Sequence, residues 1–230
     1  MSEQLTAAEG AAVIGAPEQI LKSAPAKPRT SQDVEDDIAK RFAKDTANHQ
    51  MAVLHDDGLY RHLRFTSNPR GYGEYWFDLI TWPGCLTVRG DVGDGYTFAR
   101  LDDMFQFFRA DRDINPHYWA EKLGGGRQSV KRYSEAAFRQ IVVELFEAAV
   151  RYSDAPLGLG KAVRADILDA DLYDESQARR TLEDFEFKGF TFDDTWEYSF
   201  RDFDPQFLWC CHAIAWGIAQ YDAARKAVAA

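Results

Sequence analysis

Cysteine is scarce in this chain, which has only three: Cys85, Cys210 and Cys211. Two of them are adjacent in sequence, which is poor geometry for a bridge, and pairing either with the third would leave one over. The sequence also has no Cys-x-x-Cys motif and no Cys/His spacing typical of a zinc site. We therefore expect reduced, buried thiols in a cytoplasmic protein, and no disulfide framework.

Long hydrophobic runs are also missing. The longest apolar stretch covers residues 207–221 and is interrupted by His212 and Gln220, whereas a membrane helix needs about 20 apolar residues. Residues 1–30 lack the basic start and apolar centre of a secretory signal. The expectation is a cytoplasmic protein without a membrane partner.

Positive charge and recognisable catalytic motifs are lacking as well. The chain has 27 Lys and Arg against 37 Asp and Glu, and its net charge of −10 argues against non-specific binding to a phosphate backbone. The segment GDVGDG at 90–95 matches neither an EF-hand nor a P-loop and is typical of a tight turn. No G-x-S-x-G elbow is present. The sequence therefore predicts no cofactor and no metal, and it leaves any catalytic residue unknown.

What the chain does contain is a clear alternation of strand and helix patterns. Residues 50–100 hold apolar-polar segments separated by turns such as Asp57-Gly58, which predicts an antiparallel meander of about five strands. From residue 101 the apolar period becomes helical, and it is clearest at 134–152. A final helix, apolar on nearly all sides, begins at Asp204-Pro205.

The predicted fold class is α+β, with an antiparallel β-meander of about five strands covered by C-terminal helices. We expect residues 1–30 to be a mobile tail and 31–230 to be a single domain, sheet-rich at 50–100 and helical at 101–230. Neither part alone would bury enough surface to fold. One or two further strands are expected within 188–200, and the strand around Asp78 is expected to be covered on both faces.

Charged side chains interrupt the apolar strands, and Asp78 is the most unusual because it lies between Trp76 and Trp82. A buried carboxylate needs a partner, and Arg64, Arg89 and His62 are the nearest candidates. Asp78 is then either half of a structural ion pair or an acid that faces a ligand. The candidate ligand-binding residues, all on adjacent predicted strands, are Tyr60, His62, Arg64, Asp78, Trp82 and Arg89.

Charge is polarised along the chain. Residues 60–132 carry eleven basic and nine acidic side chains, for a net charge of +2, whereas residues 165–205 carry four and thirteen, for −9. The two regions either pair with each other, or they provide an acidic face for a basic protein or an arginine-lined pocket for an anion.

Five blocks carry a resemblance to a known family: HLRF (62–65), YWFDLITWPG (75–84), GD…YTFAR (90–100), DMFQFFR (103–109) and INPHYWAEKL (114–123). In residue identity and spacing they resemble a widespread set of uncharacterised proteins encoded by tailed bacteriophages and prophages. The resemblance covers roughly residues 55–125 and leaves 1–30 outside. It implies an accessory phage protein in the cytoplasm of the bacterial host, and it assigns no catalytic residue.

Three functional hypotheses follow. The first is a non-enzymatic phage accessory protein that counteracts host defence by sequestering a small anionic nucleotide or by inhibiting a host protein. The second is a metal-assisted or His-dependent phosphoesterase that uses His62, Asp78, Asp91 and His117. The third is a structural or dimerising phage module, so homo-oligomerisation stays open.

Overall fold

The computed structural model describes residues 27–93, 95–110 and 113–229. The described residues form two compact units, which we treat separately: a sheet unit (within 31–132 and 202–229) and a helical unit (27–30 and 133–201). The sequence had predicted one domain for 31–230. The mobile tail expected at 1–30 lies, up to residue 26, outside the described residues.

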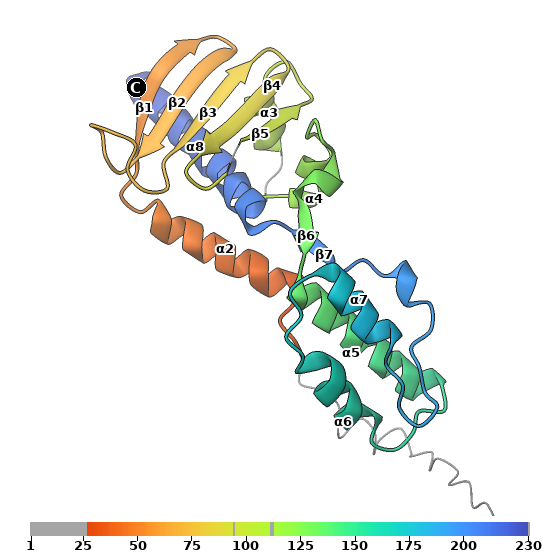
Figure 1. Ribbon diagram of the computed structural model, residues 1–230. Coiled ribbons are helices and arrows are strands. Elements are labelled where there is room, and N and C mark those ends of the chain that lie inside the picture. Colours follow the sequence, from red (N-terminus) through yellow and green to blue (C-terminus); the bar gives the residue numbers. More distant parts are fainter. Residues whose placement is uncertain (1–26, 94, 111–112, 230) are drawn as a thin grey trace, which may run out of the picture. The chain divides into compact units, whose positions relative to one another are not determined.

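Five antiparallel strands form the sheet of the sheet unit (Figure 1). They lie side by side in chain order: β1 (Gln50–Asp57), β2 (Tyr60–Thr66), β3 (Phe77–Trp82), β4 (Cys85–Gly90) and β5 (Tyr96–Ala99). Gly58 and Gly84 turn the chain with φ of 62° and 83°, a conformation that glycine adopts without strain. The predicted α+β class and its five-stranded meander are thereby confirmed.

Helix α8 (Pro205–Ala229) packs across one face of this sheet (Figure 1). The approach is close at Gly217, where a Cβ would lie 2.7 Å from Leu79 Cδ1 and 3.1 Å from the Phe65 ring. The lack of a side chain at Gly217 therefore lets the helix settle onto β2 and β3. Helix α2 (Ser31–Asp45) packs against α8, and the indole of Trp209 donates a hydrogen bond of 3.1 Å to Asp45.

Three short helices complete the sheet unit: α3 (Met104–Ala110), α4 (Pro116–Ala120) and the 3-10 turn η1 (Arg127–Val130). Helix α4 begins as its sequence predicts, because Asn115 Oδ1 accepts a hydrogen bond of 3.0 Å from the Tyr118 amide. Pro116 occupies the first helical position, where its missing N–H has no cost.

One face of the sheet is buried and the other is open. Side chains on the α8 side form the core of this unit, among them Leu63, Phe65, Phe77, Leu79, Leu86, Val88 and Phe98. Alternate residues of the same strands point to the opposite side, which we call the open face. On it Ile80 is partly exposed and Trp82 is 38% exposed, whereas Asp78 is completely buried, so the cover expected on both faces of β3 is complete on the α8 side and partial on the open face.

The helical unit has a separate core. Its elements are α5 (Glu135–Tyr152), α6 (Leu159–Val163), the π-helical turn η2 (Arg164–Leu168), α7 (Glu175–Glu183) and the 3-10 turn η3 (Thr195–Glu197). Phe138, Val142, Phe146, Leu182 and Phe200 are buried together in this core. The helices therefore bury their apolar faces against one another, which is why the prediction of a single domain differs from the structure.

The strands expected within 188–200 are absent from that segment, which the structure describes throughout. Lys188, Gly189 and Asp194 have φ of 51°, 78° and 52°, and these left-handed residues break the extended backbone. Its aromatic side chains instead pack against the core of the helical unit, among them Phe190, Phe192 and Tyr198. The apolar residues of this segment predict a strand, but in the structure they fill a core from an irregular loop.

The chain passes between the two units twice, at residues 132–133 and 201–202. Each passage lies within a short strand, β6 (Lys131–Tyr133) or β7 (Arg201–Phe203), and these strands pair as a two-stranded sheet. Hydrogen bonds flank the pair, from the Ser134 amide to the Phe200 carbonyl and from the Asp204 amide to the Val130 carbonyl, both 2.9 Å.

Candidate functional site

The six candidate ligand-binding residues lie on the open face of the sheet. Arg64, Asp78 and Arg89 are direct cross-strand neighbours on β2, β3 and β4. His62 lies two residues from Arg64 on the same side, opposite Ile80. Tyr60 and Trp82 continue this side toward the ends of their strands and are 53% and 38% exposed. The strand register therefore brings all six to one surface.

Asp78 is the buried centre of this surface. Its side chain has no solvent exposure, and Arg64 donates two hydrogen bonds to its carboxylate, from Nε to Oδ1 and from a terminal nitrogen to Oδ2, both 2.8 Å. His62 Nε2 lies 3.1 Å from Oδ2. Burial alone would raise the pKa of Asp78, but the hydrogen bonds from Arg64 and His62 hold it below its ordinary value. Asp78 is therefore an ionised structural anchor for Arg64.

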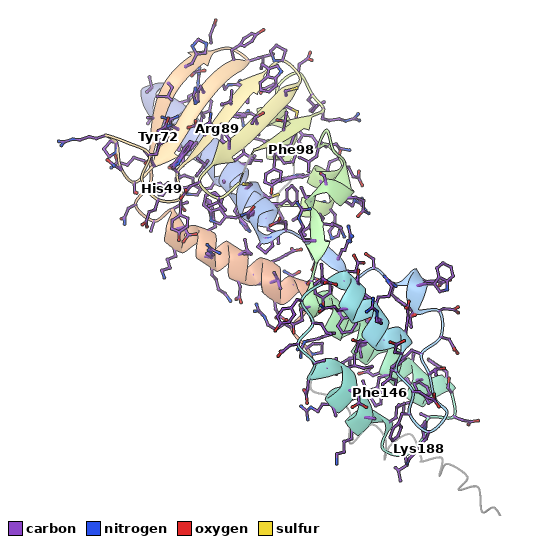
Figure 2. The ribbon with its side chains drawn as sticks, viewed as in Figure 1. His49, Tyr72, Arg89, Phe98, Phe146 and Lys188 are labelled. Atoms are coloured by element: carbon purple, nitrogen blue, oxygen red, sulfur yellow. The ribbon has the colours of Figure 1, made fainter. Side chains whose placement is uncertain are left out.

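Two aromatic side chains from the loop between β2 and β3 lie against the arginines. Arg64 stacks on Tyr72 and Trp76, with the guanidinium carbon 4.6 Å and 5.3 Å from the ring centroids. Arg89 lies 5.4 Å from the Trp76 centroid, and Figure 2 shows Tyr72 and Arg89 near one another at this end of the sheet. These distances are typical of cation–π contacts.

Arg89 differs from Arg64 in its partners. Arg64 has only 23% of its side chain exposed and is engaged by Asp78. Arg89 is exposed, and among the described residues it has no carboxylate partner. The open face thus offers one guanidinium that is held in place by an aromatic ring and is still able to bind an anion.

The loop that carries Tyr72 and Trp76 is held by specific hydrogen bonds. The hydroxyl of Thr66 donates to the Tyr72 carbonyl, and the amide of Tyr75 donates to Asp91 Oδ2 at 2.8 Å. Tyr75 has a left-handed φ of 56°, so this contact fixes a strained residue. The site predicted from the sequence does not include Tyr72, because the glycine-rich sequence of this segment (GYGEYW) is typical of an ordinary loop.

The four residues of the phosphoesterase hypothesis do not form a metal cluster. Asp91 is occupied in capping Tyr75. The ring of His117 packs 4.8 Å from Phe203, and its pKa is lowered by burial and then by the nearby charges of Lys131 and Arg127. In the described part of the chain, no three His, Cys, Asp or Glu side chains gather closely enough to hold a metal ion.

Comparison of the chain with protein-family models, with curated proteins and with solved structures gives no match. Within the residues that the structure describes, no helix combines the length and apolar character that crossing a membrane requires. The chemistry of the site itself combines a positioned guanidinium with exposed aromatic rings.

Proposed function

We propose that the protein is a phage accessory protein that acts by binding, and that it sequesters a small anionic nucleotide on the open face of its sheet. In this proposal it works in the cytoplasm of the bacterial host and counteracts a defence system by withholding the nucleotide. The resemblance to phage-encoded proteins supports the setting, and the chemistry of the open face supports the kind of ligand.

The observation that carries the proposal is the environment of Arg89. Its guanidinium is exposed, has no carboxylate partner among the described residues, and rests on Trp76. An arginine in this state suits a phosphate, which accepts two parallel hydrogen bonds. Tyr60, Tyr72 and Trp82 expose aromatic surface on which a nucleobase can stack. Arg64 has a supporting role, since its hydrogen bonds are committed to Asp78.

Titration calorimetry with mononucleotides and cyclic dinucleotides tests the proposal. We expect saturable binding by the wild type and a loss of about tenfold or more in affinity for Arg89→Ala, because one charge-assisted contact of about 1.4 kcal/mol corresponds to a factor of ten. Arg41→Ala, an exposed arginine on α2, is the matched control and should bind as the wild type does. Equal affinities for Arg89→Ala and Arg41→Ala would contradict this site.

Recovery of the bound nucleotide separates sequestration from catalysis. A binding protein should deplete free nucleotide to one equivalent and release it unchanged on denaturation. A phosphoesterase should convert an excess of nucleotide at substoichiometric protein when Mg²⁺ or Mn²⁺ is supplied.

Inhibition of a host protein is a second candidate function, and the surface of the helical unit favours it. Trp196 and Tyr173 are 71% and 82% exposed, within the region whose net charge is −9. Exposed aromatics in an acidic region of the chain suit a basic partner. Co-purification from infected cells should then yield a defined partner whose recovery is lost in Trp196→Ala and retained in Arg89→Ala.

A further inference from the structure

The helical unit contains a cavity that the open-face proposal does not use. Its volume is about 450 Å³, which falls within the usual range for small-molecule sites. It is lined by the segment before α2, by the first turns of α5, and by the π-helical turn η2. Its charged lining residues are Lys27, Arg29, Glu135, Arg139, Arg164 and Asp169.

The charge of this lining is opposite to that of its surroundings. Residues 133–201 carry 8 basic and 15 acidic side chains, for a net charge of −7. The cavity nevertheless has four basic and two acidic side chains, so its net charge is +2. Basic side chains that gather around a hollow in an otherwise acidic unit raise the local concentration of anions there.

Contacts among the lining residues determine which cations are available. Arg139 donates to Glu135 over distances of 2.9 Å and 2.5 Å, one helical turn apart, so these two charges neutralise each other. Arg164 is exposed and has no carboxylate partner among the described residues. Arg164 is therefore the guanidinium best able to take a ligand anion.

Two backbone features point at the same cavity. Helix α5 begins at Glu135 and runs for 18 residues, and Ala136 in its first turn lines the cavity, so the positive end of the helix dipole lies there. In η2 the Asp169 amide donates a hydrogen bond of 2.8 Å to the Arg164 carbonyl, five residues earlier, which is the hydrogen bond that defines a π-turn. This closure places Arg164 and Asp169 on the same side of the chain, and π-turns recur at functional sites.

We infer that this cavity is a binding site for a small phosphorylated molecule, in which Arg164 contacts the phosphate and the start of α5 supplies further positive potential. Pro28 and Leu168 give the lining an apolar part that suits the uncharged body of such a ligand. Asp169 opposes the anion and limits affinity. The site uses no residue of the open face and is independent of the function proposed above.

Calorimetry with pyrophosphate, and with a nucleoside monophosphate, at constant ionic strength tests this inference when all proteins carry Arg89→Ala, which removes the proposed open-face site. We expect saturable binding at one site and about tenfold weaker binding for Arg164→Ala. The matched control is Arg180→Ala, which removes an exposed arginine of the same unit on α7 and should leave the affinity unchanged. Both side chains are exposed, so neither variant is expected to alter the fold.

A second variant is expected to strengthen binding rather than weaken it. Asp169→Asn removes the opposing charge and should tighten binding about threefold, a gain that loss of a merely structural residue would not produce. The inference is overturned if the wild type shows no saturable binding at millimolar ligand, if Arg164→Ala and Arg180→Ala weaken binding equally, or if Asp169→Asn weakens it. Saturable binding that remains in Arg89→Ala and is weakened by the further change Arg164→Ala belongs to this cavity. Loss of all binding in Arg89→Ala would assign it to the open face and overturn the inference.

Discussion

The sheet unit buries Asp78 and Arg61, each against an opposite charge, whereas the only buried polar residue described in the helical unit is Thr195. In the sheet unit, Arg61 pairs with Asp103 at 2.9 Å beneath the ring of Phe105, and Arg64 pairs with Asp78 beside Tyr72. The helical unit keeps its charges at the surface and around its cavity. Interior ion pairs thus fix the geometry of the sheet unit, whereas the ion pairs of the helical unit, such as Arg139 with Glu135, lie nearer its surface.

The two units also differ in net charge and in histidine content. The sheet unit has a net charge of −3 and contains all five histidines of the chain, whereas residues 133–201 have a net charge of −7 and no histidine. The stability of the sheet unit should therefore depend on the protonation of its interior, and that of the helical unit should not.

The largest expected effect tests whether the two cores are energetically separate. Phe98 and Phe146, labelled in Figure 2, are completely buried, one in each core. Replacing either with alanine should cost about 4 kcal/mol, because a large cavity is left behind. Hydrogen exchange should show lost protection in the sheet unit for Phe98→Ala and in the helical unit for Phe146→Ala. Equal loss over both units in either variant would refute separate cores.

The next effect concerns the buried charge. Arg64→Ala leaves Asp78 buried without its main partner and should lower the free energy of unfolding of the sheet unit by about 3 kcal/mol. Arg89→Ala, on β4 at the other side of Asp78, should change it by less than about 0.5 kcal/mol. The double variant Arg64→Met with Asp78→Leu should regain most of the loss. Urea denaturation measures all three, and similar losses for Arg64→Ala and Arg89→Ala would show that the pair is not structural.

A more gradual effect is expected with pH. Burial is the main cause that lowers the pKa values of His49, His117 and His212 below the ordinary 6.5. The unfolded chain therefore binds protons more readily than the folded chain, so the stability of the sheet unit should fall as the pH drops from 7 through about 6.5.

Tryptophan fluorescence can follow this pH effect, because five of the six tryptophans belong to the sheet unit. The urea midpoint should fall from pH 7 to pH 5, and His212→Leu should flatten the slope. Protection of helical-unit amides should stay constant over the same range. A midpoint that rises on acidification would reverse the sign of the argument.

The smallest expected effect concerns the side chains that cap one helix in each unit. Asn115 caps α4 in the sheet unit, and Ser134 Oγ accepts a hydrogen bond of 3.2 Å from the Ala137 amide at the start of α5. Alanine at either position should cost about 1 kcal/mol. Thermal denaturation of the two variants checks this, and a silent Ser134→Ala would indicate that the start of α5 is held by other contacts.

Much of the sheet unit could be predicted because its signals are local. Asp57-Gly58 fixes a turn, alternation then assigns a side to each strand residue, and so Arg64, Asp78 and Arg89 could be expected on one face. Asn115 and Pro116 marked the start of α4 by cap chemistry alone.

What could not be predicted depends on distant segments. The cavity brings together Lys27, Arg139 and Arg164, which share no periodicity in sequence. Tyr72 covers Arg64 because a loop folds back over the sheet, and the sequence of that loop carries no strand or helix pattern. The two separate cores also escaped prediction, since apolar periodicity shows which side of a helix is buried and not which helices it is buried against.

The paired strands β6 and β7 have a consequence for the history of the chain. The points at which the backbone leaves the sheet unit and returns to it are hydrogen-bonded neighbours, although about 70 residues separate them in sequence. A short turn between β6 and β7 would close the sheet unit without residues 134–200. A gene could therefore gain, lose or exchange this segment as one piece and leave the fold of the sheet unit intact.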